Sequence, residues 1–329
     1  MIISQTPFRV SFFGGGTDFP EFFREHGGAT LLTSIGPSCY ISIHRINKFF
    51  QFRFRASYAK TELVQEPSEF QHPLIRECLL ALDIKEGLEI THFSDLPGRT
   101  GLGTSSSFTV GLLHCLHAFR GERVTAEDLA REAIHIERER VGDAGGRQDQ
   151  YAAAYGGFIR LDFHKDGQVG VRPLTISSQR MGELEKHLLM FYTGKEKTAE
   201  PILRQQQKQT KKNEKALLEM LHLVTEAENL VTREQPISGF GELLHRAWEL
   251  KRTLSDGITN DSIDQAYEAA RKAGATGGKI LGAGGRGFLL LFAKPEHHSV
   301  IRDRLAPMQE VDVHFSQCGS RIIFQAPDM

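Results

Sequence analysis

Residues 97–107, with the sequence PGRTGLGTSSS, combine glycine and hydroxyl residues in a pattern that could bind phosphate. They lie just before an apolar stretch, residues 108–119, that predicts a helix. The N–H groups that open a helix have no partner within it and carry partial positive charge, and glycine lets a ligand approach the backbone closely. Hydroxyl oxygens are also suitable ligands for Mg²⁺. The segment therefore predicts a loop that holds nucleotide phosphates.

This segment does not follow the best-known phosphate-loop patterns. The Walker pattern has a lysine directly after its last glycine, whereas Thr104 follows Gly103 here. The glycine spacing also differs from GxGxxG. A simple turn in which a serine caps the following helix is the alternative interpretation.

Residues 6–18 (TPFRVSFFGGGTD) form another glycine cluster at the end of an apolar segment that predicts a strand. Three consecutive glycines expose backbone to a ligand. Thr17 and Asp18 follow them and offer polar groups of the kind that hold sugar hydroxyls. The alternative is that Asp18 only caps a helix that starts at Phe19.

Residues 137–150 carry carboxylates at two informative positions. Glu137 follows Ile134 by three residues and Ala133 by four, so helical spacing places it on a buried stripe. A buried carboxylate needs a partner, which would be a metal at the phosphate loop or an arginine. Asp149 follows a double glycine and is a candidate general base, or alternatively a helix cap.

Residues 279–288 (KILGAGGRGF) contain a further glycine cluster, with four glycines in the six positions 282–287. A hairpin between two short strands does not need so many glycines. Close packing against a ligand or against another loop explains them better.

In this order, the segments resemble the motifs of the galactokinase, homoserine kinase, mevalonate kinase and phosphomevalonate kinase (GHMP) superfamily. Residues 7–18 match its first motif, 97–107 its second and 279–287 its third. The stretches FRVSFFGGGTD and GRQDQYAAAYGG are most similar to those of the D-glycero-D-manno-heptose phosphate kinases. The resemblance covers nearly the whole chain.

The resemblance implies a role for individual positions. Asp149 matches the aspartate that removes the proton from the acceptor hydroxyl, and Arg9 matches the basic residue beside it. Ser105 and Glu137 match the Mg²⁺ ligands. The positions implied to bind ATP are Pro97, Gly101, Leu102, Gly103, Thr104, Ser105 and Ser106. Those implied to bind the acceptor are Gly15, Gly16, Thr17, Asp18, Gly284, Gly285 and Arg286.

The implied function is an ATP- and Mg²⁺-dependent kinase acting on the anomeric hydroxyl of D-glycero-D-manno-heptose 7-phosphate. The alternatives are a kinase of an unphosphorylated sugar such as fucose or galactose, and a non-catalytic sensor of ATP and sugar. A sugar phosphate requires a second anion site, which a basic side chain would form. For each candidate, the alternative interpretation is an ordinary solvent-exposed charge. The candidates are Lys195, Lys197, Arg204, Arg53, Arg55, Arg99 and Arg286.

Composition is consistent with a small-molecule enzyme. The chain has 329 residues, 40% hydrophobic and 25% charged, with a formal net charge of −1, which does not suggest a nucleic-acid partner. Its four cysteines show no metal or disulfide spacing. Without an apolar run of membrane-spanning length or a signal-peptide pattern, we expect a cytoplasmic monomer or homodimer.

The elements that must position these segments form two α+β halves that join near residues 165–180. The resemblance implies an N-terminal ribosomal-protein-like α/β domain, residues 1–172, and a C-terminal ferredoxin-like domain, residues 173–329. Periodicity predicts strands that Pro7 and Pro37 interrupt, and an alternating segment, residues 50–55, whose phenylalanines face the core. It also predicts one long helix over residues 202–231 and a strand over 311–315.

Overall fold

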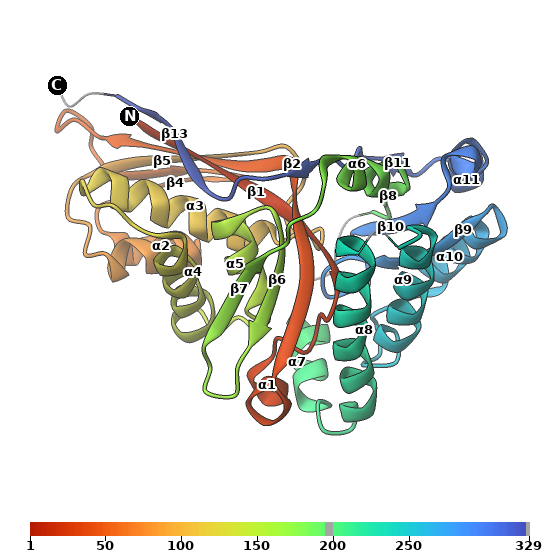
Figure 1. Ribbon diagram of the computed structural model, residues 1–329. Helices are drawn as coiled ribbons and strands as arrows, with labels where there is room; N and C mark the ends of the chain where they lie inside the picture. Colours follow the sequence, from red (N-terminus) through yellow and green to blue (C-terminus); the bar gives the residue numbers. More distant parts are fainter. Residues whose placement is uncertain (195–199, 234, 327–329) are drawn as a thin grey trace.

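Two long antiparallel strands, β1 (Ile2–Phe13) and β2 (Gly28–Arg45), form the centre of the larger of two sheets in the computed structural model (Figure 1). The structure describes residues 1–194, 200–233 and 235–326. Along β1 most side chains are buried, as expected of a central strand with helices and further chain packed around it.

The larger sheet has nine strands, with the main order β13-β1-β2-β5-β3-β4. β6 and β12 also pair with β2, and β7 pairs with β6. Its remaining strands are β3 (Phe54–Ser57), β4 (Thr61–Val64), β5 (Leu88–Ser94), β6 (Phe158–Phe163), β7 (Val169–Pro173), β12 (Phe315–Ser316) and β13 (Arg321–Gln325). The last two strands therefore return from the end of the described chain to the first sheet.

Helices cover one side of this sheet, and α3 is central among them because it packs directly on β1 and β2 (Figure 1). The helices of this part are α1 (Pro20–His26), α2 (Pro73–Ala81), α3 (Thr104–Phe119), α4 (Ala126–Ile134) and α5 (Gln148–Tyr155). A 3-10 turn (Pro67–Glu69) precedes α2, and a π-helical turn (His135–Arg140) continues α4. Thr125 caps α4 through a capping box with Asp128.

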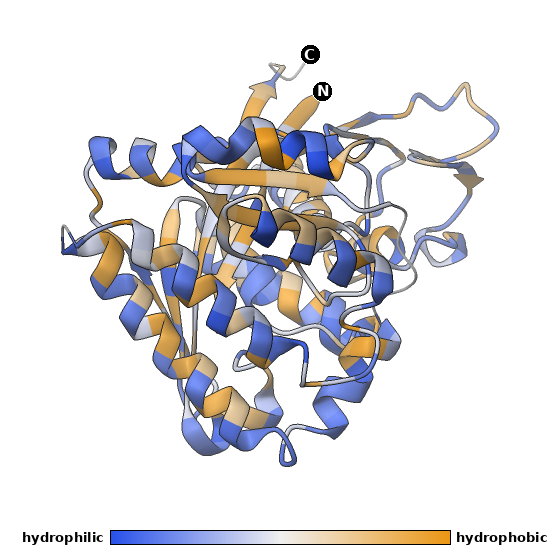
Figure 2. Cartoon of the chain, turned by 90° about the vertical axis from the view of Figure 1, so that its right-hand side faces the viewer, coloured by the Kyte–Doolittle hydropathy of each residue, from blue (hydrophilic) through white to orange (hydrophobic). Residues whose placement is uncertain are grey.

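The second part has a four-stranded sheet in the order β11-β8-β10-β9, with helices packed on it. Its strands are β8 (Leu188–Tyr192), β9 (Ala275–Ile280), β10 (Phe288–Ala293) and β11 (Gln309–Glu310). Its helices are α6 (Ser178–Lys186), α7 (Glu200–Lys208), α8 (Glu214–Thr232), α9 (Ser238–Lys251), α10 (Asp261–Lys272) and α11 (His298–Leu305), the last preceded by a 3-10 turn (Pro295–His297). Figure 2 shows helices with hydrophobic residues along one side and hydrophilic residues along the other, the pattern that directs a helix onto a core.

The two parts are joined by aromatic packing and by a buried lysine. The ring of Phe240 in α9 lies 5.2 Å from that of Phe12 and 5.3 Å from that of Phe13, both at the end of β1. Lys279 Nζ donates to the carbonyl of Phe12 at 2.8 Å. The end of β1 leads into the first glycine segment, which contains the three glycines 14–16. This end of the strand is thereby fixed by both parts of the molecule.

The prolines do not interrupt the two long strands as predicted. β1 runs through Pro7, and the pairing of β1 with β2 shifts register between Pro7 and Phe8. Proline has no N–H to donate, so it is tolerated in a sheet where such an irregularity removes the need for one. β2 likewise continues through Pro37, which lies beside the same irregularity.

Three other predicted elements differ from the structure. Phe50 is 53% exposed and only Phe54 is fully buried, so the predicted alternation over residues 50–55 is wrong for its first half. The predicted helix over 202–231 is two helices, α7 and α8, because a turn follows Lys208 in which the Thr210 hydroxyl bonds to the carbonyls of Gln206 and Gln207. Of the predicted strand over 311–315, residues 311–314 cross between β11 and β12, which belong to different sheets, and only Phe315 lies in a strand, β12.

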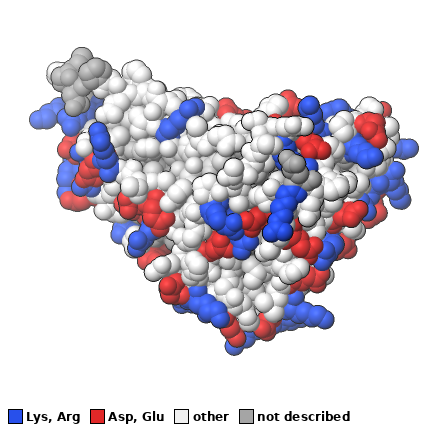
Figure 3. Space-filling model, viewed as in Figure 1, with Lys and Arg blue, Asp and Glu red and all other residues white. Residues whose placement is uncertain are grey.

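Charge on the surface is mixed. Figure 3 shows basic and acidic side chains interspersed over the face seen in Figure 1. Among the described helices, none is both long enough and apolar enough to cross a bilayer.

Candidate active site

The second glycine segment, residues 97–107, forms a tight loop from which α3 begins. Gly103 takes the left-handed conformation, with φ 72°, directly before the first helical residue, Thr104. The hydroxyl of Thr104 accepts a hydrogen bond from the Arg99 N–H at 3.0 Å, and the Thr100 hydroxyl donates to the Pro97 carbonyl at 2.9 Å. α3 therefore begins directly from a braced loop, and the N–H groups that open a helix in this way can bind anions.

The third glycine segment, residues 279–287, packs directly on this loop. A Cβ on Gly282 would lie 2.4 Å from the Cα of Gly101, and one on Gly287 would lie 2.4 Å from the carbonyl oxygen of Thr100. Both glycines also have positive φ, at 67° and 114°. The prediction that these glycines serve close packing against another loop is confirmed, since backbone meets backbone here without room for side chains.

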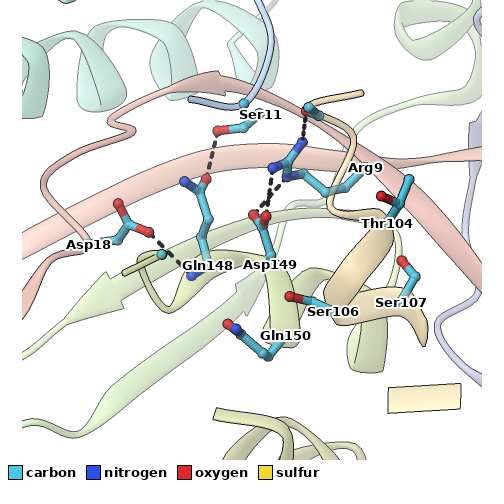
Figure 4. Close-up of polar contacts among 12 residues, drawn as sticks. Arg9, Ser11, Asp18, Thr104, Ser106, Ser107, Gln148, Asp149 and Gln150 are labelled. Atoms are coloured by element: carbon cyan, nitrogen blue, oxygen red, sulfur yellow. Dashed lines mark hydrogen bonds and ion pairs between the residues drawn. The ribbon is translucent and has the colours of Figure 1, made fainter. Parts of the chain in front are cut away.

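Arg9 and Asp149 form a bidentate pair beside the loop (Figure 4). Arg9 Nε donates to Asp149 Oδ1 at 2.8 Å and Nη2 donates to Oδ2 at 2.7 Å. Arg9 Nη1 donates to the carbonyl of Gly101 at 2.6 Å. Arg9 is 4% exposed, whereas the Asp149 side chain is 27% exposed, so a charged fork is fixed in the interior and a carboxylate remains accessible.

Asp18 does not cap the helix that follows it. The cap residue of α1 is Phe19, and the Asp18 carboxylate instead accepts from the N–H of Gly16 at 2.9 Å and from that of Gln148 at 3.4 Å. Burial raises the pKa of Asp18; the Gly16 N–H opposes this rise and the charge of Asp149 adds to it. Gly146 covers the carboxylate, because a Cβ there would overlap it.

The other predicted acceptor-binding positions have mixed surroundings. The buried Thr17 hydroxyl donates to the carbonyls of Gly14 and Ala29, both at 2.8 Å, so it shapes the glycine turn. Gly15 faces the side chain of Gln148: a Cβ added to Gly15 would lie 3.7 Å from Nε2 of Gln148.

The remaining predicted acceptor-binding positions are Gly16, Gly284, Gly285 and Arg286. The three glycines contact residues of the second part of the molecule. Gly16 faces Leu217, Gly284 packs against the backbone of Ile258, and Gly285 lies against the carbonyl of Gly257. Arg286 is exposed. It does not take positive φ, which among the described non-glycine residues falls on Asp83 and Arg99.

Glu137 is buried, as its spacing predicts, and its partners are polar side chains rather than an arginine. Its Oε2 accepts from the Ser106 hydroxyl at 2.8 Å and from the Gln150 amide. Burial raises the pKa of Glu137 to about 7 against the opposing hydrogen bonds, including those from Gln150 and Ser106. Ser105 is exposed, so the structure brings Ser106 rather than Ser105 against Glu137.

Two oxygens in this group have no hydrogen-bond partner among the described residues. They are Oε1 of Glu137 and Oε1 of Gln150, both buried. With the Ser106 hydroxyl they form a set of hard oxygen donors of the type that Mg²⁺ takes. Across the described residues, no cluster of three or more His, Cys, Asp or Glu side chains has the arrangement of a metal site. A cation here would thus rely on a single carboxylate together with neutral oxygens, water and phosphate.

Two buried lysines near the site were not predicted. Lys251 Nζ donates to the carbonyl of Ile280 at 3.2 Å and to that of Gly282, in the third glycine segment. Burial lowers the pKa of Lys251 to about 7, Arg9 lowers it further, and Asp18 and Asp149 oppose this. Burial also lowers the pKa of Lys279, to well below its ordinary value.

Several candidates for a second anion site already have partners. Arg204 bonds to Glu200 at 2.6 Å and to the Gly142 carbonyl at 3.3 Å. Arg53 pairs with Glu66, and Arg55 pairs with Glu89. The exposed Arg99 takes φ 59° at the edge of the phosphate loop, while Lys195 and Lys197 lie outside the described residues.

Comparisons with known proteins identify the family of this chain. The family model for the GHMP kinases N terminal domain matches residues 73–157, and that for the GHMP kinases C terminal matches residues 227–306. A D-glycero-alpha-D-manno-heptose 7-phosphate kinase from Campylobacter jejuni is 29% identical over 89% of this chain and 90% of its own length. The bifunctional fucokinase/GDP-fucose pyrophosphorylase of Arabidopsis thaliana is 27% identical over 94% of this chain and 31% of its own length.

Solved structures share the fold. A D-glycero-D-manno-heptose 1-phosphate kinase from Bacteriodes thetaiotaomicron superposes with a TM-score of 0.81 over 99% of this chain and 100% of its own, at 22% identity. A galactokinase from Lactococcus lactis, solved with galactose, gives 0.75 over 97% and 94%, at 16% identity. The predicted two-part α+β fold is confirmed. The chain belongs to the GHMP kinases and is an ATP-dependent phosphotransferase that acts on an alcohol group.

Proposed function

We propose that this enzyme transfers the γ-phosphoryl group of ATP to the anomeric hydroxyl of D-glycero-D-manno-heptose 7-phosphate. The product would be the 1,7-bisphosphate, a precursor of nucleotide-activated heptose for surface polysaccharide. The similarity to the Campylobacter enzyme over nearly the full length of both chains supports this choice of sugar. The observation that carries the chemistry is the Arg9–Asp149 pair, fixed beside the phosphate loop with its carboxylate accessible.

Asp149 and Arg9 have complementary roles in this reaction. Asp149 accepts a hydrogen bond from the anomeric hydroxyl, orients its oxygen toward the γ-phosphorus and takes its proton as the new P–O bond forms. Because the transition state of phosphoryl transfer is loose, proton removal comes late and orientation is the larger contribution. Arg9 fixes the carboxylate and the Gly101 carbonyl in one geometry and places positive charge beside the transferred group.

The phosphate loop and the buried polar group beneath it would hold the nucleotide. The first-turn N–H groups at Thr104–Ser106 would bind the phosphates of ATP. Glu137, Ser106 and Gln150 would hold Mg²⁺ through the oxygens described above, with Ser105 on the exposed side of the same turn. When bound, the cation neutralises charge on the β- and γ-phosphates.

A kinase of an unphosphorylated sugar such as fucose is the second candidate. The Arabidopsis fucokinase matches 94% of this chain. In addition, Arg53, Arg55 and Arg204 are engaged by carboxylates of the chain itself, which reduces their availability to a substrate phosphate. A heptose phosphate would then have to displace such a pair or be recognised elsewhere.

An ATP-consumption assay with Mg²⁺ over a panel of acceptors tests the proposal. The panel comprises heptose 7-phosphate, heptose 1-phosphate, unphosphorylated heptose, fucose, galactose and mevalonate, with ³¹P NMR to identify the product. Turnover confined to heptose 7-phosphate, with two phosphate-ester resonances, is expected. Turnover of fucose instead would favour the second candidate. Binding of ATP without turnover of any acceptor would favour a sensor.

A further inference from the structure

The side chain of Gln148 is held in a defined orientation directly beside Asp149. Gln148 is the first residue of α5, and its N–H donates to Asp18. Its Oε1 accepts a hydrogen bond from the Ser11 hydroxyl at 2.7 Å, and Ser11 is only 5% exposed. A buried hydroxyl thus anchors the oxygen end of the carboxamide.

β1 presents two residues to two consecutive residues of α5. Arg9 and Ser11 are two positions apart on the strand and therefore point to the same face. Arg9 holds Asp149, and Ser11 holds Gln148 (Figure 4). Two strand residues span about 6.7 Å, which is on the scale of a sugar ring. The carboxylate and the carboxamide are consequently held by two neighbouring positions on the same face of β1.

The nitrogen end of the carboxamide has unused donors. Among the described residues, the hydrogen bonds of Gln148 are those with Ser11 and Asp18, so Nε2 keeps both hydrogens. Figure 4 shows this nitrogen on the Asp18 side of the carboxamide. It also faces Gly15, where an added Cβ would lie 3.7 Å away. With glycine at position 15, no side chain from this turn covers the oriented N–H₂ group.

We propose that Gln148 is a specificity-determining residue, whose Nε2 donates a hydrogen bond to a sugar hydroxyl near the reacting one. This inference rests on the proposed sugar-kinase function. A carboxamide nitrogen can only donate, so it selects an acceptor oxygen at that position. A sugar that lacks the hydroxyl leaves the donor unpaired when the site closes, which disfavours the deoxy analogue.

The test compares Gln148→Met, which keeps the length of the side chain and removes the donor, with the wild type. The measurement is kcat/KM for D-glycero-D-manno-heptose 7-phosphate and for its monodeoxy analogues, each at saturating ATP. The wild type should lose roughly 10- to 100-fold on one analogue. Gln148→Met should lose a similar factor on the parent sugar and little more on that analogue. Its KM for ATP should stay unchanged.

Two further variants separate recognition from folding. Ser11→Ala leaves Gln148 in place but releases its oxygen, so it should weaken discrimination against the same analogue. Gln179→Met, on the exposed surface of α6, is the matched control and should behave as the wild type. If all variants rank the analogues in the wild-type ratios, Gln148 has no part in specificity. If the wild type turns over no sugar, the proposed function fails and this inference with it.

Discussion

Arg9 and Asp149, 140 residues apart in sequence, share two parallel hydrogen bonds of 2.8 and 2.7 Å. The same guanidinium reaches the Gly101 carbonyl, so one side chain aligns the candidate base with the phosphate loop. A planar fork is needed for this, because a lysine ammonium cannot make two parallel bonds to a carboxylate.

Replacing Arg9 by lysine should therefore lower kcat while preserving charge. We expect a decrease of about 10- to 100-fold, because a misaligned carboxylate forfeits the near-attack geometry. Steady-state kinetics with the preferred sugar, together with a thermal melt, measures both effects. Arg302→Lys, at an exposed bidentate pair with Glu310, is the matched control. Wild-type kcat in Arg9→Lys would show that charge alone suffices.

Asp149→Asn should reduce kcat by at least about 100-fold, in line with loss of general-base catalysis. Binding of ATP should persist, because the phosphate loop remains intact, and isothermal titration calorimetry measures it. Asp166→Asn, in the exposed turn between β6 and β7, is the control and should leave kcat unchanged. Normal turnover by Asp149→Asn would remove this residue from the mechanism.

Glu137→Gln should stabilise the ligand-free protein, and more so as pH rises. The pKa of Glu137 is raised from 4.5 to about 7, so between these values the folded state binds a proton that the unfolded chain has released. The free energy of unfolding of the wild type therefore falls as pH rises from 4.5 to about 7. Above this window it stays about 3 kcal/mol below its value at acidic pH. Glutamine removes this cost.

Thermal melts at acidic and at alkaline pH, with and without Mg²⁺ and ATP, test this prediction. The variant should exceed the wild type most at alkaline pH without ligand. Added Mg²⁺ and ATP should stabilise the wild type more than the variant. Equal gains from the ligands in both proteins would place the cation away from Glu137, and a pH-independent difference would contradict the raised pKa.

Gly282→Ala should separate the third glycine segment from the phosphate loop. Its Cβ would lie 2.4 Å from the Gly101 Cα, and backbone atoms cannot yield as a flexible side chain would. A displacement on the order of 1 Å can reduce kcat/KM by about 100-fold. Gly182→Ala, in α6 with open space around it, is the control and should stabilise the fold by about 0.5–1 kcal/mol. Unchanged kinetics in Gly282→Ala would mean that the two loops move independently.

Local spacing was sufficient to predict some of the candidate site. The interval from Ala133 and Ile134 to Glu137 predicted a buried carboxylate, and the structure confirms it. Lys251 shows the same pattern of a charged residue on an apolar helix stripe, because it follows Ala247 by four residues and Trp248 by three. A charged residue on an apolar stripe is informative in both cases because burial of a charge requires a partner.

Other features depend on tertiary geometry that one sequence does not contain. Which hydroxyl of the run 104–107 meets Glu137 is set by the helical register after Gly103, and it is Ser106. The break between α7 and α8 lies in a polar stretch without glycine or proline, so no local residue marks it. The end of α5 that carries Gln148 could be located, but the role of Ser11 in holding it depends on the approach of a distant strand.

The pairing of β13 with β1 has a consequence for biosynthesis. Ile2 and Ile3 lie opposite Gln325 and Phe324, so the outer edge of β1 is covered only by residues that leave the ribosome more than 300 positions later. Until then the nascent first part exposes an unpaired strand edge, which is a template for association with other chains. A fragment ending near residue 172 would keep that edge permanently open. The sheet that carries Arg9 and Ser11 is therefore complete only after residues 321–325 have been synthesised.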